Sequence, residues 1–196
     1  MYITWWHHKS RECILIPRVQ MTFIEPSVLV ISSNHHHYLL KVTFTGSEVT
    51  NNATYAGSRG HAGTDYVKYR LEMRIESPSG ADFDGYRALY AAVDTHNTIS
   101  KLLEIDTLTG QGQLICQVHQ QVRRLNSDEF SGGIYFTTGS RFGVIEMNEG
   151  TTAVRILVGG GGDGTGALGD SQLKNPLSFT QVKEKFWLIC DNGNHR

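Results

Sequence analysis

The hydrophobic and polar positions of this chain alternate in short runs, and no stretch keeps a helical period for long. Runs rich in β-branched and aromatic residues are bounded by Gly, Asn, Asp or Ser, which is the pattern of strands separated by tight turns. The clearest runs are SVLVISS, YLLKVTFTG, GIYFTTG, FGVIEMNEG, AVRILVG and KFWLICD. The one longer helix-like stretch is broken at Thr109-Gly110, and we interpret it as two strands joined by a turn. The pattern predicts an all-β fold.

One local order recurs four times: an apolar strand, a polar turn and a second strand that most often ends at a turn glycine. The predicted hairpins lie near residues 27–46, 88–110, 134–150 and 186–196. Aligning their turns places four residues at equivalent positions, namely Asn34, Asn97, Ser140 and Asn194. A repeat of roughly 40 to 50 residues with four strands has the length of a β-propeller blade. We therefore expect an N-terminal segment over residues 1–11 and a partial β-propeller of about three to four four-stranded antiparallel sheets over residues 12–196.

The last forty residues carry the most specific pattern, LVGGGGDGTGALGDSQLKNPLSFTQVKEKFWLICDNGNHR. A Gly-rich loop, an L-x-x-P segment, two strands and an Asp-x-x-Asn-His-Arg end follow one another in the order of a blade of the NHL-repeat propellers, which the chain resembles. ISSNHHHYLLKVTFTG and AAVDTHNTISKLLEIDTLTG look like weaker copies, and TTGSRFGVIEMNEG lacks the Asn-His core. Ser32 or Ser33 stands where a repeat Asp is expected, and Thr98 replaces the His of the second copy.

The resemblance implies a non-catalytic interaction module that binds a protein partner. RNA is a second partner class that the family implies. A propeller enzyme of lyase or lactonase type, with a metal in the central channel, is the alternative, and its candidate ligands here are His35, His61, His96 and the acidic loop residues. The chain stops within the fourth copy, so we expect a fragment of a longer protein. The alternatives are self-association through an open sheet edge, or a last blade completed by strands from the N-terminal segment.

The recurring turn residues are expected to be structural. Asp and Asn side chains accept hydrogen bonds from backbone N–H groups two residues ahead, and Gly and Asn tolerate positive φ. In the hexapeptide DNGNHR, His195 and Arg196 are then expected to begin the next strand, and Asp191 with His195 lacks a third metal ligand nearby. The residues assigned to this repeat-turn motif are Asn34, His35, Asp94, Asn97, Asp191, Asn194, His195 and Arg196.

Two further stretches are weak candidates for metal binding. In NHHHY, His35 and His37 would share one face of a strand and could contribute to a zinc site. In GGGGDGTGALGD, Asp163 lies among turn glycines and could contribute to a calcium site, although the EF-hand spacing is absent. The same loop lacks the Gly-Lys-Ser/Thr end of a phosphate-binding loop. No catalytic residue is assigned from the sequence.

Composition narrows the classes of partner. The 196 residues carry 18 basic and 19 acidic side chains, so bulk charge does not steer the chain to nucleic acid or to an anionic membrane. No apolar run approaches the roughly 20 residues of a membrane span. The cysteines are Cys13, Cys116 and Cys190, and an odd number without a CxxC pair fits reduced thiols in the cytoplasm better than a disulfide framework.

Overall fold

The computed structural model describes residues 20–95, 99–128, 131–148, 151–159, 172–183 and 186–195. Within these ranges every element is a strand except for two short 3-10 helices. The described strands form three four-stranded antiparallel sheets and one two-stranded sheet. The all-β prediction and the predicted number of repeats are therefore confirmed.

Each sheet is built from strands that are consecutive in the chain and paired in that order. Sheet 1 contains β1 (Met21–Glu25), β2 (Val28–Ser33), β3 (Tyr38–Thr45) and β4 (Glu48–Gly57). Sheet 2 contains β5 (Pro78–Phe83), β6 (Ala88–Thr95), β7 (Ile99–Asp106) and β8 (Gly112–Val118). Sheet 3 contains β9 (Arg124–Ser127), β10 (Ile134–Thr137), β11 (Phe142–Asn148) and β12 (Thr151–Val158). Sheet 4 contains β13 (Pro176–Lys183) and β14 (Phe186–Asp191).

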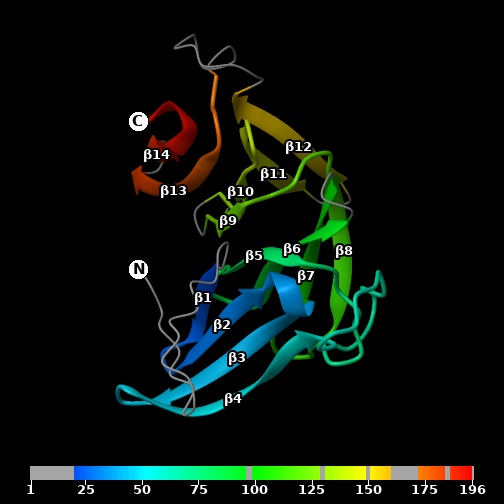
Figure 1. Cartoon of the computed structure of the whole chain (residues 1–196). Coiled ribbons are helices and arrows are strands. Elements are labelled where there is room, and N and C mark those ends of the chain that lie inside the picture. The colour runs from blue at the N-terminus through cyan, green and yellow to red at the C-terminus, as the bar shows by residue number, and fades with distance from the viewer. Residues whose placement is uncertain are drawn as a thin grey trace.

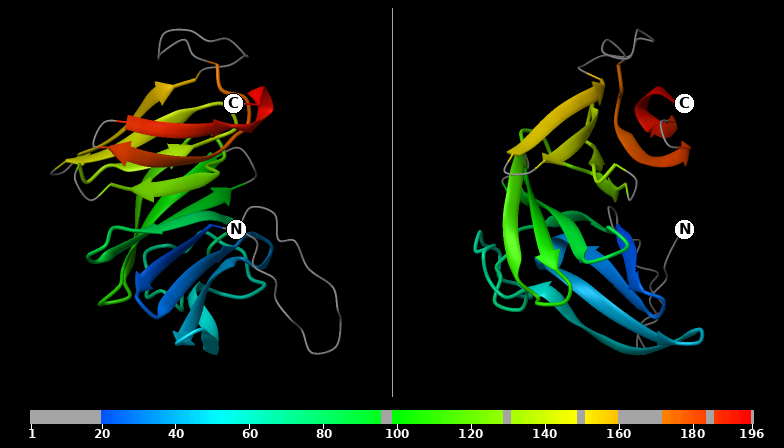
Figure 2. Two further views of the ribbon diagram at one scale, coloured as in Figure 1. Left: turned by 90° about the vertical axis from the view of Figure 1, so that its left-hand side faces the viewer. Right: turned by 180° about the vertical axis from the view of Figure 1, so that it is seen from behind.

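The sheets follow one another around an arc, from sheet 1 at the bottom of Figure 1 to sheets 3 and 4 at the top. The first strands of neighbouring sheets lie close together on the inside of the arc, where β5 contacts both β1 and β9. Strands β8 and β12 lie on the outside of the arc (Figure 1). Figure 2 shows the same succession of sheets from the side and from behind.

Successive sheets pack face to face, and the central strand β6 shows how the sequence achieves this. Its alternating side chains enter two different cores. Leu89, Ala91 and Val93 join the core shared with sheet 1. Ala88, Tyr90 and Ala92 join the core shared with sheet 3. Because both faces are buried, β6 reads as an uninterrupted apolar run rather than as an alternating strand.

A buried glutamine ties the inner strands together. Gln20 is 4% exposed and lies just before β1. Its side-chain Nε2 donates to the Leu125 carbonyl oxygen at 2.5 Å, and its Oε1 accepts from the Leu125 N–H at 2.9 Å. The amide thereby satisfies both backbone groups of a residue in β9, as a neighbouring strand would. Gly80 in β5 leaves room for this contact, because a Cβ there would lie 2.8 Å from Gln20 Oε1.

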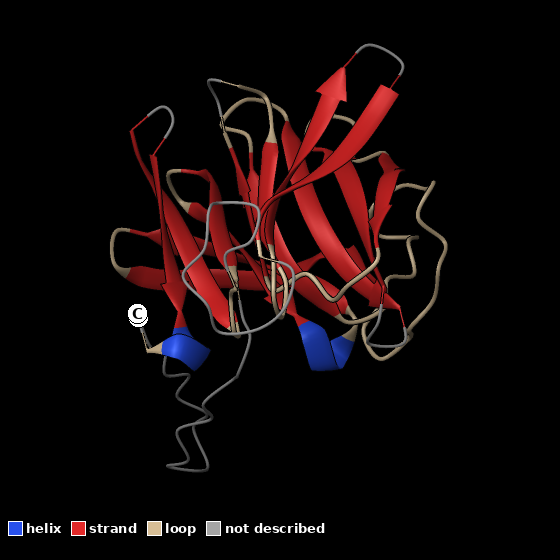
Figure 3. Cartoon of the chain, turned by 90° about the horizontal axis from the view of Figure 1, so that it is seen from above, coloured by secondary structure: helices blue, strands red, loops and turns tan. Residues whose placement is uncertain are grey.

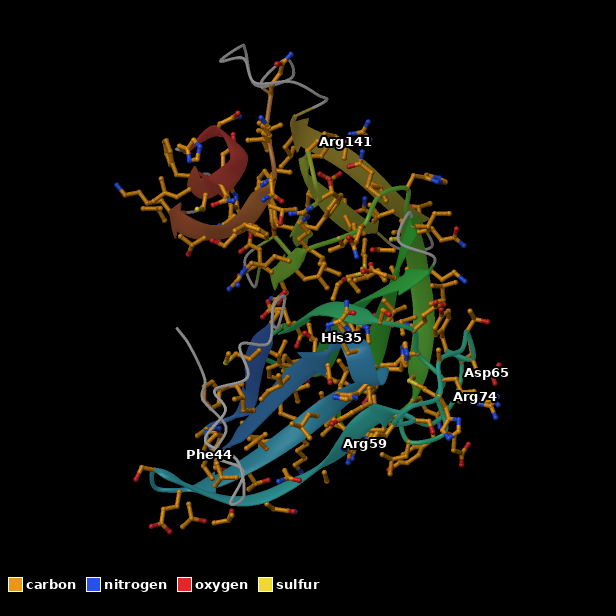
Figure 4. All side chains as sticks on the ribbon, in the orientation of Figure 1. His35, Phe44, Arg59, Asp65, Arg74 and Arg141 are labelled. Atoms are coloured by element: carbon orange, nitrogen blue, oxygen red, sulfur yellow. The ribbon has the colours of Figure 1, made fainter. Side chains whose placement is uncertain are left out.

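The segment between β4 and β5, residues 58–77, completes the core between sheets 1 and 2. It has almost no regular structure, yet it buries Tyr66, Met73 and Ile75 in the core of these two sheets. Asp65 and Arg74 form an isolated antiparallel bridge within it and lie together at the outer edge of the molecule in Figure 4. The long spacing between the first two predicted hairpins is therefore explained by an insertion that packs as part of the fold.

Both 3-10 helices follow the second strand of their sheet. η1 (Asn34–His36) connects β2 to β3, and η2 (Asn192–Asn194) follows β14. Figure 3 shows the two helices at the same end of the sheets. No helix among the described residues has the length and apolarity that crossing a bilayer requires.

Candidate functional site

Five large apolar side chains gather on three loop segments beside sheet 2. We call this set the loop patch. The β5–β6 loop and the β7–β8 turn each contribute one residue, and the inserted segment 58–77 contributes three. Their exposed fractions range from 36% to 87%, and the members are Val67, Tyr69, Leu71, Tyr86 and Leu108.

Two acidic side chains fix the first two loops. Asp84 Oδ1 accepts hydrogen bonds from the backbone N–H groups of Tyr86, Arg87 and Ala88 at 2.8, 2.8 and 2.9 Å. Asp106 Oδ1 accepts from the N–H groups of residues 108 and 109 in the same manner. These are the turns that an Asp side chain favours. Tyr86 and Leu108 are therefore held on ordered loops although their own side chains are exposed.

Further contacts join the two loops to each other. Arg87 Nε donates to Asp106 Oδ2 at 2.6 Å, and the guanidinium Nη2 forms an ion pair with the same oxygen. The Arg87 carbonyl oxygen accepts from both the backbone N–H and the hydroxyl of Thr107, at 2.9 and 2.8 Å. The loops that carry Tyr86 and Leu108 thus lie side by side.

The inserted segment joins the same group at Gly110. Arg70 N–H donates to the Gly110 carbonyl at 2.7 Å, and Gly112 N–H donates to the Lys68 carbonyl at 3.0 Å. Gly110 has φ +73°, and a Cβ there would lie 2.5 Å from the Tyr69 ring. The ring can pack on this turn only because the residue is glycine. Three segments that are distant in the sequence are therefore held next to one another.

A small hollow lies next to the loop patch, between sheets 2 and 3. It has a volume of about 350 Å³. Its described lining comes from the β5–β6 loop, from β6 and from the β9–β10 connection, and includes two carboxylates and no basic residue: Asp84, Gly85, Tyr86, Tyr90, Ser127, Asp128 and Gly132. We refer to it as the acidic hollow.

Tyr90 has an unusual environment within this lining. The side chain is 7% exposed, and its hydroxyl has no hydrogen-bond partner among the described residues. Burial raises the pKa of the Tyr90 hydroxyl, and the nearby carboxylates of Glu104 and Asp84 raise it further. The hydroxyl therefore stays protonated, and it can donate or accept a hydrogen bond in the hollow.

The Asp106 carboxyl group provides a test of the loop geometry. The hydrogen bond from the Arg87 side chain, followed by those from backbone N–H groups, lowers the pKa of Asp106 from 3.8 to about 2. A lowered folded-state pKa stabilises the fold above the unfolded value, and this contribution is lost as the pH falls through about 2. We expect carboxyl-detected NMR to show the pKa of Asp106 rising toward its ordinary value in Arg87→Gln. Arg155→Gln on sheet 3 should leave it unchanged, and an unchanged pKa in Arg87→Gln would contradict the ion pair.

The histidine cluster lies in a turn, not on a strand, which corrects the expectation for His35 and His37. His35 is exposed within η1, and His37 follows η1 with φ 61°. His37 Nδ1 accepts a hydrogen bond from the Ser77 N–H at 3.1 Å. This nitrogen therefore holds the chain before β5 and is not open to a metal ion. His61 lies in the inserted segment, in a bridge with Ser58.

The repeat-turn residues fall at related positions, with a different register from the sequence alignment. Ser33 precedes η1 and His37 follows it in the left-handed region, whereas Asp191 precedes η2 and His195 follows it with φ 56°. Asn34 therefore corresponds to Asn192 rather than to Asn194. The left-handed residue at each turn is a histidine, whereas the sequence favoured Gly or Asn there. His195 belongs to this turn, so it does not begin a strand.

Each sheet places a buried polar side chain at or just after the end of its second strand. Ser32, Asp94, Thr138 and Asp191 are all at most 2% exposed. Asp191 Oδ1 accepts from the Lys174 N–H at 2.7 Å, and its Oδ2 accepts from Asn194 Nδ2 at 2.7 Å. Asp191 thus binds the chain that enters its own sheet rather than a backbone N–H group two residues ahead.

Four of the remaining candidate site residues are not described by the structure. Asn97, Asp163, Arg196 and His96 lie outside the part of the chain that the structure describes. Among the residues that it does describe, no group of three or more His, Cys, Asp or Glu side chains could hold a metal ion.

Cys116 is a free thiol whose pKa burial raises to about 11, so it stays protonated near neutral pH. The loop patch was not predicted, because its members are separate in the sequence.

Solved structures of β-propeller proteins resemble this fold. A chain from the crystal structure of a nidogen/laminin complex matches 83% of this chain and 53% of its own length, with 16% sequence identity and a TM-score of 0.54. Hydrazine synthase of Kuenenia stuttgartiensis matches 89% of this chain and 42% of its own, with 13% identity and a TM-score of 0.51. The chain thus spans about half the length of the solved chains that it matches. No protein-family model and no curated protein matches the sequence. At such identities the similarity shows the fold, which is a partial β-propeller.

Proposed function

We propose that this chain is a non-catalytic, protein-binding propeller module of the NHL-repeat type, and that it binds its partner through the loop patch. The observation that carries the proposal is the patch itself. Five exposed apolar side chains lie on loops that are fixed by backbone and side-chain hydrogen bonds. Exposed aromatic residues on a preorganised surface are characteristic of the residues that dominate binding energy at protein interfaces.

The chemistry around the patch also suits a protein partner. The Arg70 guanidinium lies 4.7 Å from the centre of the Tyr55 ring and 5.9 Å from that of Tyr69. Arginine and tyrosine are enriched at interface hot spots. The rim of the patch carries charges of both signs, such as the Lys68–Asp65 pair at 3.3 Å, and so lacks the single-sign surface that a nucleic acid selects.

A second group of exposed apolar residues, on β13 and β14, supports this assignment less well. Leu177, Val182, Phe186 and Leu188 are 47% to 68% exposed. They lie on sheet 4, and in this chain the apolar residues of one sheet pack against those of the next sheet. Exposed apolar residues on strands are therefore weaker evidence for a protein partner than those on the loops.

The nidogen/laminin match adds general support, because a chain with this fold is found there in a protein–protein complex.

The proposal is tested by comparing what immobilised variants capture from a cell extract. Tyr86→Asp with Leu108→Asp places two charges in the loop patch. We expect this double variant to lose partner binding by about 30-fold or more, because the loss of even one hot-spot residue costs about 2 kcal/mol. The control is Val49→Asp with Val154→Asp, which places two charges at exposed apolar positions on β4 and β12, away from the loop patch. Captured proteins are quantified by mass spectrometry.

Two outcomes would overturn the proposal. One is a set of captured proteins that is the same for the wild type and the patch variant. The other is capture that ribonuclease treatment abolishes, because the patch would then serve an RNA rather than a protein.

A further inference from the structure

The Tyr90 hydroxyl lies beside the loop patch and has no hydrogen bond to the described residues. Tyr90 as a whole residue is 7% exposed and lines the acidic hollow. The hydroxyl is not enclosed by protein atoms and opens onto the hollow, where it is available to a polar group. A ligand in the hollow can therefore form a hydrogen bond with it.

The carboxylates around Tyr90 define the charge of that occupant. Asp84 uses Oδ1 for three backbone N–H groups, and its Oδ2 has no partner within the described ranges. Asp128 is 4% exposed and lines the opposite wall, where its Oδ2 accepts from the Ser131 hydroxyl at 2.6 Å. Asp82 and Glu104 are the direct cross-strand neighbours of Tyr90, so their side chains leave the same face of sheet 2.

The described lining of the hollow contains no basic residue. The nearest described cation on the β5–β6 loop is Arg87, and its guanidinium is already paired with Asp106. A hollow with carboxylates and a hydroxyl that can accept a hydrogen bond suits a group with several N–H donors and a positive charge. A metal ion fits less well, because the described residues contain no cluster of three ligands.

We infer that the acidic hollow binds a lysine or arginine side chain of the protein partner. The inference rests on the proposed function, because Tyr86 belongs both to the loop patch and to the wall of the hollow. Asp84 Oδ2 and the Tyr90 hydroxyl are the groups that receive the cation, and Asp128 contributes negative charge from sheet 3. The apolar part of the partner covers the loop patch at the same time.

The test uses short peptides as probes of the hollow. The probes are acetyl-Gly-Lys-Gly-amide and acetyl-Gly-Arg-Gly-amide, and the control peptide carries acetyl-lysine, which has no charge. The readout is the change in the backbone amide NMR signals of Gly85 and Gly132, which lie on the two sides of the hollow. We expect the charged peptides to shift both signals at millimolar concentrations and the acetylated peptide to shift neither.

Two variants identify the groups that bind. Asp84→Asn keeps an oxygen for the loop N–H groups and removes the charge, and we expect affinity to fall about tenfold. Tyr90→Phe keeps the ring in the core and removes the hydroxyl, and it should weaken binding severalfold. Arg155→Gln, on the outer side of sheet 3, is the control and should not change affinity.

The results separate this inference from the proposed function. If neither charged peptide shifts the two signals, or if Asp84→Asn binds as tightly as the wild type, the inference is wrong. Calcium chloride shifting the same signals at micromolar concentration would also overturn it in favour of a metal ion. In each of these cases, capture that depends on the loop patch can persist, and the proposed function then stands without the inference.

Discussion

Phe136→Ala is expected to cost about 3 to 5 kcal/mol of the free energy of unfolding. Phe136 is fully buried at the centre of the core between sheets 2 and 3. The packing is tight, because a Cβ on Gly143 would lie 2.7 Å from the Phe136 ring. Removal of the ring leaves a cavity that neighbouring strands cannot readily fill. Since single domains unfold with about 5 to 15 kcal/mol, the loss is a large share of the total.

Urea denaturation followed by circular dichroism measures this effect. The matched control is Phe23→Ala on β1, where the side chain is 57% exposed, and we expect it to change stability by less than about 1 kcal/mol. Equal losses for the two variants would mean that sheets 2 and 3 do not pack as described.

Asp94→Ala is expected to cost about 3 kcal/mol or more. The Asp94 carboxylate is 1% exposed. Its Oδ1 accepts from the hydroxyls of Ser79 and Ser100, and its Oδ2 accepts from Gln121 Nε2 at 2.6 Å. The Ser100 hydroxyl oxygen in turn accepts from the Val122 N–H at 2.7 Å. The substitution removes the acceptor of the buried Ser100 hydroxyl, and it removes the Asp94 oxygens that accept from Ser79 and Gln121.

The control for this prediction is Asp94→Asn. Its amide oxygen can still accept from the serine hydroxyls, but its NH₂ group faces the Gln121 donor, so we expect an intermediate loss of stability. The same urea denaturation compares the two variants. Equal stability for Asp94→Ala and wild type would show that this network does not join sheet 2 to the chain that leads into sheet 3.

The strands were predictable because their physical signal is local. Runs of β-branched and aromatic residues between turn residues identified β2, β3, β6, β7, β8, β10, β11, β12 and β14. The fourfold recurrence correctly predicted sheets built from consecutive strands. β9 was not identified, because its four residues, Arg124–Ser127, are largely polar and owe their place to Gln20 and Asp82.

The turns and the inserted segment were less predictable. A left-handed conformation at His37 and His195 depends on contacts across the turn, such as the hydrogen bond from Ser77 to His37, rather than on the residue's own preference. The segment 58–77 has no period that marks Tyr66, Met73 and Ile75 as core residues. These three side chains are buried because two sheets meet beside them.

The candidate site required the three-dimensional structure for the same reason. The loops of Tyr69, Tyr86 and Leu108 are held together by backbone contacts between residues up to 44 positions apart, from Lys68 to Gly112. The acidic hollow likewise takes Asp84 from sheet 2 and Asp128 from sheet 3. By contrast, the histidine pattern was conspicuous in the sequence, and in the structure it belongs to a turn.

Amide hydrogen exchange, measured on the chain alone and on the chain saturated with a captured partner, tests the central claim most directly. Binding through the loop patch predicts slower exchange at residues 67–71, 85–87 and 107–110, with little change near η1 and the β10–β11 connection. Protection confined to η1 and that connection, with the loop patch exchanging as in the free chain, would contradict the account.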